Sequence, residues 1–276
     1  MRALLTIAVT LAAAAAAPAA SAHCREAAVE GEAPPAEWTR FLEEAMADAY
    51  LTTGELAVSH CGVPVEGYKA GLTTQAAQRR FGADGPLLGV LFRGTVLPDK
   101  AEIAVAGVER PMWEADFLFV VGNPAINAAA TREEALAALR GFRPFIEVAA
   151  LPSPSGAALT AADLRRANVA AWRGAGGPER SLAGVSAEAL AAMRVKAFDG
   201  TGALVAEGVG ADALGHPLDV VLWVRDQVRA RGGRLKPGDV ISVGAFTPLT
   251  APKPGDMITV RYEGLPGDPE VSVRFR

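Results

Sequence analysis

Two carboxylates stand two residues apart in a run of the sequence that is otherwise apolar. The run, residues 111–122, reads PMWEADFLFVVG and places Glu114 and Asp116 among aromatic and aliphatic side chains. Its length and composition predict a buried β-strand, on which residues i and i+2 point to one face, about 7 Å apart. Two acids on one face of a core strand repel each other and are costly to bury without a cation between them. The run therefore predicts a charged site that needs a cationic partner.

A third acid, Glu147, lies in a second strand-like apolar run, FIEV at residues 145–148. Three carboxylates from two strands make a hard, all-oxygen site suited to Mg²⁺ or Mn²⁺, with positions left for water and substrate. Histidine and cysteine pairs at zinc-ligand spacing are missing from the sequence. The alternative is that the acids form structural ion pairs with arginines such as Arg110 or Arg143, and the residues alone favour neither interpretation.

Lys69 is the candidate for the acid–base group. It is one of five lysines in the chain and stands between glycines in GYKAGLT, residues 67–73. Glycines let the backbone approach a ligand closely, and a partly buried lysine can have its pKa lowered enough to act as a base. The alternative is a surface lysine beside a turn.

The first 22 residues have the pattern of a secretory signal peptide. A positive start at Arg2 precedes an apolar stretch to Ala17, and the small residues ASA at 20–22 predict cleavage after Ala22. An uncleaved N-terminal anchor is the alternative. Cleavage would leave 254 of the 276 residues, and the exported product is expected in the periplasm or outside the cell.

The remaining chain has the composition of a mildly acidic globular protein. The full chain carries a net charge of −4, which argues against nucleic acid as a partner. After the signal no stretch of the sequence is long and apolar enough for a membrane span, so no membrane association is expected after cleavage. Cys24 and Cys61 are the two cysteines, and an oxidising compartment makes a disulfide between them a hypothesis.

Hydrophobic periodicity and turn signals predict the elements. Apolar spacing and capping patterns predict helices over 37–51, 74–80, 131–140, 160–172 and 216–231. Strands are expected at 63–72, within 81–98, and at 102–107, 113–121, 143–151, 193–199, 203–208, 240–243, 257–261 and 271–275. The order of these elements predicts an α+β protein built on a rolled, mixed β-sheet.

Several of these motifs together resemble the 2-keto-4-pentenoate hydratase group of the fumarylacetoacetate hydrolase family. GYKAGLT at 67–73 is similar to the family's GYKxGLT signature, and PMWEADFLF at 111–119 is similar to its P-x-x-E-x-E-x-x-F metal strand. FIE at 145–147, GVGADALGHPL at 208–218 and LKPGD at 235–239 follow in the family's order. The resemblance covers nearly all of the chain after the predicted signal.

The resemblance implies a mixed β-sheet roll of the fumarylacetoacetate hydrolase type, with peripheral helices and a small N-terminal helical region. Residues 23–66 would form that N-terminal segment and 67–276 the catalytic domain. The family's tendency to assemble implies a homo-oligomer.

The resemblance also assigns the site. Glu114, Asp116 and Glu147 would hold Mg²⁺ or Mn²⁺, Lys69 would do acid–base work, and Leu72 would contact the substrate. The partner would be a 2-oxo acid, which can chelate the metal through its carboxylate and keto oxygen, or the corresponding 2-hydroxydienoate enol.

Four segments depart from the family's pattern. Asp116 replaces a glutamate, Leu87 replaces an aspartate often assigned an acid–base role, VAALP at 148–152 lacks the acid of the family's I-V-D-S-R segment, and Ala170 replaces a serine. Two functions therefore stay open. One is a metal-dependent hydratase or lyase, with C–C hydrolase or decarboxylase chemistry included. The other is a secreted, catalytically impaired member of the family that binds an oxo acid or metal without turnover.

Overall fold

The computed structural model describes residues 65–154 and 156–276. The signal peptide 1–22, the helix expected over 37–51 and the Cys24–Cys61 pair lie outside the described residues and stay predictions. Across the described ranges, every helix is too short or too polar to cross a bilayer.

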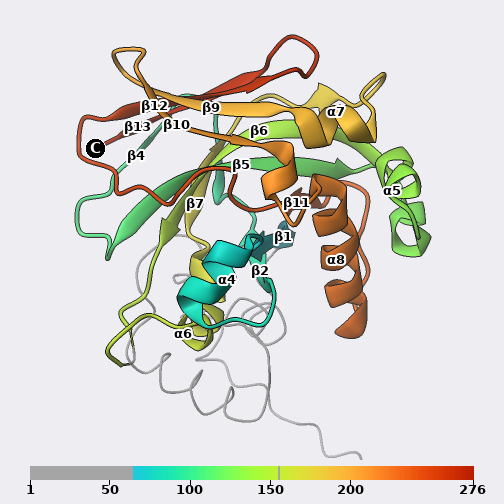
Figure 1. Cartoon of the computed structure of the whole chain (residues 1–276), viewed down its shortest axis with the longest axis horizontal. Coiled ribbons are helices and arrows are strands. Elements are labelled where there is room, and N and C mark those ends of the chain that lie inside the picture. The colour runs from blue at the N-terminus through green and yellow to red at the C-terminus, as the bar shows by residue number, and fades with distance from the viewer. Residues whose placement is uncertain (1–64, 155) are drawn as a thin grey trace, which may run out of the picture.

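Two β-sheets stack face to face, and helices surround them (Figure 1). The larger sheet has the order β2-β1-β11-β5-β6-β7-β3, with β8 paired to β6, and the smaller has the order β10-β9-β12-β13-β4. The strands of the larger sheet are β1 (Val65–Gly71), β2 (Leu87–Phe92), β3 (Val96–Pro98), β5 (Pro111–Val121), β6 (Leu139–Ala150), β7 (Arg173–Gly176), β8 (Arg180–Ser181) and β11 (Val240–Ser242). The smaller sheet contains β4 (Ala101–Ile103), β9 (Arg194–Asp199), β10 (Leu204–Val209), β12 (Met257–Glu263) and β13 (Glu270–Phe275).

The core lies between the two sheets and is built largely by one side of β5. Trp113, Phe117 and Phe119 point to the same face of the strand and are almost fully buried. Phe117 stacks on Phe142 of β6 with ring centroids 4.8 Å apart and meets Tyr262 of the smaller sheet at 5.6 Å. Each such aromatic contributes about 1.5–3 kcal/mol by burial, so the sheets are fixed against each other along this strand.

The other side of β5 carries the acids. Because successive side chains alternate, Glu114 and Asp116 point away from the aromatic core. The Tyr262 hydroxyl reaches through from the smaller sheet to the backbone carbonyls of Asp116 and Phe145 and accepts a hydrogen bond from the Phe145 N–H. Tyr262 thus fixes the backbone of β5 and β6 at the acids from the side of the smaller sheet.

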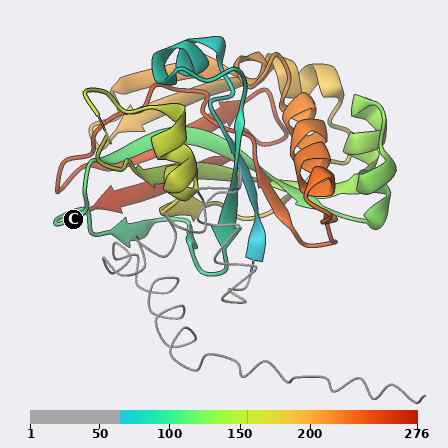
Figure 2. The same ribbon diagram turned by 90° about the horizontal axis from the view of Figure 1, so that it is seen from below.

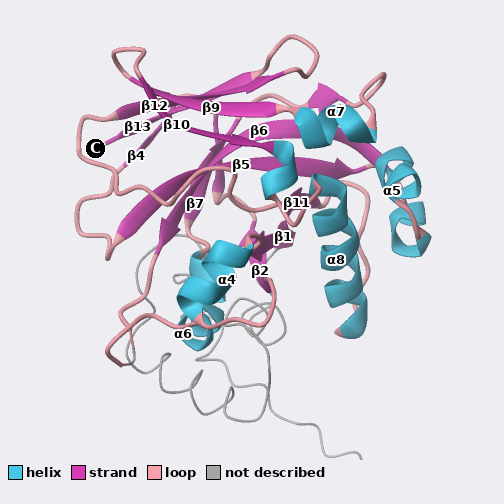
Figure 3. Cartoon of the chain, viewed as in Figure 1, coloured by secondary structure: helices cyan, strands magenta, loops and turns pink. Residues whose placement is uncertain are grey.

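The helices lie at the periphery of the sheets (Figure 3). At one end, α8 (Pro217–Ala230) packs beside α5 (Arg132–Ala138) and α7 (Ala187–Ala192), as the view from below also shows (Figure 2). The turns η1 (Pro124–Ala128) and η3 (Gly210–Asp212) pack against α5 and α7, respectively. Away from these helices, α6 (Ala161–Arg166) and the short turn η2 (Asn168–Ala170) pack on β2, and α4 (Gln75–Phe81) joins their apolar cluster through Phe81.

His216 caps the longest helix and gives a test of pH-dependent stability. Its Nδ1 accepts from the Leu218 N–H at 3.0 Å, and its Nε2 lies 2.9 Å from the Ala187 carbonyl, an arrangement that requires the neutral ring. Burial lowers the pKa of His216, opposed by the Ala187 hydrogen bond, with Arg132, Asp219 and Glu188 as the charged neighbours. The unfolded chain therefore binds the extra proton first, and we expect stability to fall as pH drops below about 6.5.

Urea unfolding between pH 8 and pH 5 checks this expectation. A His216→Asn variant keeps a capping acceptor without a titratable ring and should lose less stability toward pH 5 than the wild type. His216→Ala should lose about 1 kcal/mol at pH 8, where the neutral cap is fully formed. Parallel pH profiles for wild type and His216→Asn would contradict the assignment.

The α+β class and the mixed sheet are confirmed. The helix predicted over 160–172 is wrong beyond its first half: α6 ends at Arg166, and residues 168–170 turn the other way, with φ of 50°, 58° and 57°. The helix predicted to Arg140 ends at Ala138, and β6 begins at once. β4 covers only the start of the strand expected over 102–107. The short elements β7, β8 and α7 were not predicted from the sequence.

Candidate metal centre

The register between β5 and β6 brings the three acids together. The strands are antiparallel, with Glu114 directly opposite Glu147 and Asp116 opposite Phe145. Side chains directly opposite each other have Cβ atoms about 5 Å apart, and diagonal neighbours are within reach of long side chains. We call the group formed by Glu114, Asp116 and Glu147 the carboxylate cradle.

Lys69 supplies the cation that the sequence required. From β1 its Nζ contacts Glu147 Oε1 and donates a second hydrogen bond to the Val169 carbonyl at 3.1 Å. Lys69 is 3% exposed and Glu147 2% exposed. Glu147 is therefore ion-paired, but with Lys69 and not with the arginines considered from the sequence.

Asp116 is the most firmly held of the acids and is fully buried. Its Oδ1 accepts from the N–H of Phe117 at 2.6 Å and of Gly244 at 3.0 Å, and its Oδ2 accepts from the Ser242 hydroxyl. Gly244 has φ of +92°, and a Cβ there would lie 2.4 Å from the Thr73 hydroxyl. Only glycine therefore brings this N–H to the carboxylate without strain.

The shared burial of these groups shifts their protonation. Burial, and then the Glu147 charge, raises the pKa of Glu114 well above its usual range and that of Asp116 to about 8. Burial alone would lower the pKa of Lys69, but the charges of Glu147, Glu114 and Asp116 more than offset it and raise that pKa. The sequence-based expectation of a lowered lysine pKa is therefore wrong, because it did not include three neighbouring carboxylates. As placed, Lys69 is an ammonium and a proton donor.

The cradle fits a hard divalent cation by its chemistry. Glu147 Oε2 is buried and accepts no hydrogen bond from the described residues, while Glu114 keeps some contact with solvent. An unpaired buried carboxylate oxygen is costly, and a cation would satisfy it. Within residues 65–154 and 156–276, no three acid, histidine or cysteine side chains already converge on one point as ligands. The oxygens engaged by Lys69, Ser242 and backbone N–H groups would have to reorient.

A buried apolar cluster continues from the cradle toward one end of the strands. On β5 and β6 the next residues on the same face are Met112 and Ala149, which pair with each other. On β1 and β2, Lys69 pairs with Gly89, and one step further Gly71 pairs with Leu87. These side chains belong to one cluster, the apolar wall, which consists of Phe81, Leu87, Ala149, Leu151, Ala161, Leu164, Val169 and Ala170, with Leu72, Ala83, Met112 and Leu159 packed against it.

The structure places the remaining predicted site residue, Leu72, on this apolar wall. It is partly buried, has φ of 58°, and its carbonyl accepts from the Gln78 amide at 2.9 Å. Its contact with a substrate stays a prediction. Sequence reasoning missed Ser242, Asn168 and Val169 as contributors. Ser242 carries no local signal, and the other two fell within the helix predicted over 160–172, which ends at Arg166 in the structure.

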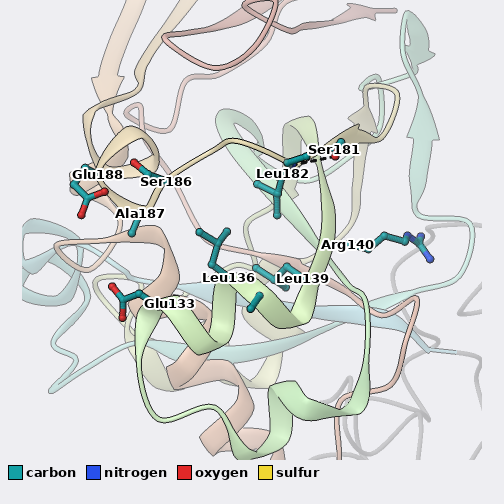
Figure 4. A pocket seen from close by; sticks show the side chains of 11 residues that line it. Glu133, Leu136, Leu139, Arg140, Ser181, Leu182, Ser186, Ala187 and Glu188 are labelled. Carbon is teal, nitrogen blue, oxygen red and sulfur yellow. Dashed lines mark hydrogen bonds between the residues drawn. The ribbon is translucent and has the colours of Figure 1, made fainter.

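A hollow in the surface lies far from the cradle. It has a volume of about 600 Å³, opens to the surface, and is lined by Leu136, Leu139 and Leu182 among others (Figure 4). Leu139 stands eight residues before Glu147 on β6, or about 26 Å along an extended strand. Its one basic residue, Arg140, is already paired with Glu179. The hollow has no part in the chemistry of the cradle.

Fold and site together define a two-sheet α+β protein whose acids and lysine meet on one sheet face. The family model described as fumarylacetoacetate (FAA) hydrolase C-terminal matches residues 67–268. The chain is 32% identical over 232 residues to the TodF product hydratase of Pseudomonas putida, with 81% of each chain covered. It is 29% identical over 244 residues to a 4-oxalocrotonate decarboxylase of Pseudomonas putida, covering 85% of this chain and 87% of the relative.

Solved structures agree. The 4-oxalocrotonate decarboxylase from Pseudomonas putida G7, complexed with magnesium and adipate, matches with a TM-score of 0.74 and 27% identity, covering 94% of this chain and 96% of that one. A fumarylpyruvate hydrolase from Pseudomonas aeruginosa, 18% identical with a TM-score of 0.60, shares the fold over 77% of this chain and 90% of its own. The protein belongs to the fumarylacetoacetate hydrolase family.

Proposed function

We propose that the protein is a divalent-metal-dependent hydratase or lyase acting on a 2-oxo acid or its 2-hydroxydienoate enol. The observation that carries the proposal is the carboxylate cradle, in which Asp116 and Glu147 are buried and Lys69 contacts Glu147. It occurs in a chain 32% identical to a hydratase across 81% of its length.

Mg²⁺ or Mn²⁺ is the proposed cofactor, held by Glu114, Asp116 and Glu147. Carboxylate oxygens are the ligands that these hard cations prefer. Solved structures of the 4-oxalocrotonate decarboxylase, 27% identical to this chain, contain magnesium in one case and calcium in another. When bound, such a cation would act as a Lewis acid on the keto oxygen of a 2-oxo acid.

The protein's own groups would then bind the substrate and move the proton. Lys69 Nζ lies at the edge of the cradle, against Glu147. From there it can hold a substrate carboxylate or enolate oxygen and donate a proton at C3. The apolar wall beside Lys69 would limit the access of bulk water to the substrate.

The apolar wall supports a substrate whose far end is uncharged. A tail that leaves the cradle past Glu114 meets Met112 and Ala149, and a tail that leaves past Lys69 meets Leu87. Each buried methylene contributes about 0.8 kcal/mol, whereas a carboxylate placed there without a partner would be strongly disfavoured. This favours a hydratase-like substrate with a hydrocarbon tail over a dicarboxylate.

Loss of dienol absorbance tests the proposal directly. With Mg²⁺ or Mn²⁺ present, we expect turnover of 2-hydroxydienoates with a vinyl or methyl end to exceed that of a terminal carboxylate analogue at least about tenfold in kcat/KM. A chelator should abolish the reaction. Tight metal binding with no turnover across the panel would instead indicate the catalytically impaired alternative.

A further inference from the structure

The turn η2 is the most strained segment beside the cradle. Asn168, Val169 and Ala170 have φ of 50°, 58° and 57°, so three consecutive residues other than glycine adopt the left-handed conformation. This conformation brings Cβ too close to the backbone, and it is particularly unfavourable for a β-branched residue such as Val169. Strained backbone of this kind persists only where surrounding contacts hold it, and it is concentrated at functional sites.

The side chain of Asn168 provides the main hold. Its Oδ1 accepts from the Val90 N–H at 2.9 Å and its Nδ2 donates to the Val90 carbonyl at 2.8 Å, so one amide clamps one residue of β2. The side chain is buried, with 6% of the residue exposed. The neighbouring Gly89 leaves room for this approach, because a Cβ there would lie 2.9 Å from the Asn168 carbonyl oxygen.

The turn η2 places the carbonyl of Val169 beside the ammonium of Lys69. Val169 O accepts the hydrogen bond from Lys69 Nζ at 3.1 Å, and Val169 Cγ1 fills the space above Gly71, where a Cβ would lie 2.3 Å away. A lysine held by one carboxylate alone can pivot on its flexible four-carbon stem. The second contact fixes the direction of the ammonium toward Glu147.

We propose that Asn168 is a positioning residue. By clamping Val90, it holds η2 in its left-handed form, so that the Val169 carbonyl fixes the Lys69 ammonium at the edge of the cradle. The catalytic consequence rests on the proposed function. The placement of Lys69 does not, and the two can be tested separately.

Asn168→Gly removes the clamp while keeping a residue that adopts positive φ readily. Asn127→Gly is the matched control, because the Asn127 amide clamps Leu235 in the same way, with hydrogen bonds to its N–H at 3.0 Å and its carbonyl at 2.8 Å. The first readout is NMR of protein labelled with ¹³C at lysine Cε. The chain has five lysines, and the Lys69 signal is the one lost in Lys69→Arg.

In the wild type, the two ε protons of an immobilised Lys69 should give separate shifts. Asn168→Gly should merge them, and Asn127→Gly should not. On the proposed substrates, Asn168→Gly should lower kcat by about 10- to 100-fold, since small misplacements of a catalytic group have effects of this size. KM and Mn²⁺ affinity should stay within about twofold. If Asn168→Gly does not fold, Asn168→Asp takes its place, since aspartate tolerates the left-handed region but cannot donate to the Val90 carbonyl.

An unchanged Lys69 signal in the folded variant, or equal effects of the two glycine variants, would overturn the proposal. If the wild type turns over none of the substrates, the proposed function fails and the lysine signal alone decides the positioning role.

Discussion

Replacing Glu114 by glutamine is expected to weaken divalent-metal binding strongly and to leave the fold intact. The pKa of Glu114 is raised by burial and by the Glu147 charge, which means that its ionised form is disfavoured in the metal-free protein. The neutral, isosteric amide removes that repulsion, so the melting temperature without metal should stay the same or rise. The loss of one of three anionic ligands should weaken Mn²⁺ binding by more than about 100-fold, beyond the effect of losing an outer contact to a ligand.

Calorimetric titration with Mn²⁺ and thermal melts with and without chelator measure both effects. Glu133→Gln is the control, because it makes the same change on the exposed first turn of α5 and should alter neither quantity. Metal affinity within twofold of the wild type in Glu114→Gln would reject the carboxylate cradle as the metal site.

Replacing Lys69 by methionine should destabilise the metal-free protein strongly and make it dependent on metal. The substitution keeps the length of the side chain but leaves Glu147 as a buried carboxylate without its cation. Breaking a buried pair in this way costs about 3–5 kcal/mol. A divalent cation can take over the role of the ammonium, so saturating Mn²⁺ should recover most of the loss, with about 2.7 kcal/mol gained at 100 times Kd. Turnover should be lost in either state.

Urea unfolding in chelator and in excess Mn²⁺ separates the two contributions. The matched control is Lys196→Met, whose partner Glu263 lies on a partly exposed strand pair. That pair should contribute no more than about 1 kcal/mol, independent of metal. Equal destabilisation of Lys69→Met with and without Mn²⁺ would show that a cation does not replace the ammonium at Glu147.

The acids were predictable because their anomaly is local. Glu114 and Asp116 interrupt a run whose length and apolar character leave no other reading than a core strand, and alternation alone puts them on one face. Glu147 repeats the anomaly on the next long strand. That the two strands are neighbours, with Glu114 directly opposite Glu147, was not predicted from the sequence and is shown by the register.

The rest of the site depends on contacts between distant parts of the chain. The apolar periodicity of 160–172 predicts one helix. The prediction fails after Arg166 because the hydrogen bonds that hold Asn168 in the left-handed region are made to Val90, 78 residues away, and no local pattern shows them. The direction of the Lys69 pKa shift could not be derived for the same reason: it is the balance of burial against carboxylates that come from other strands. Nothing in the sequence around Ser242 distinguishes it from other serines, and its role follows only from the position of β11 beside Asp116.

The division of β5 into an aromatic side and an acidic side constrains how this family member can vary or be redesigned. Inserting or deleting one residue between Pro111 and Val121 would exchange the two sides, sending Trp113 and Phe117 toward the substrate and the acids into the space between the sheets. A change in the length of this strand would therefore disrupt the core and the site together. Transplanting the cradle to another scaffold would require the register of β5 on β6 to be transferred intact, and not merely three acids and a lysine.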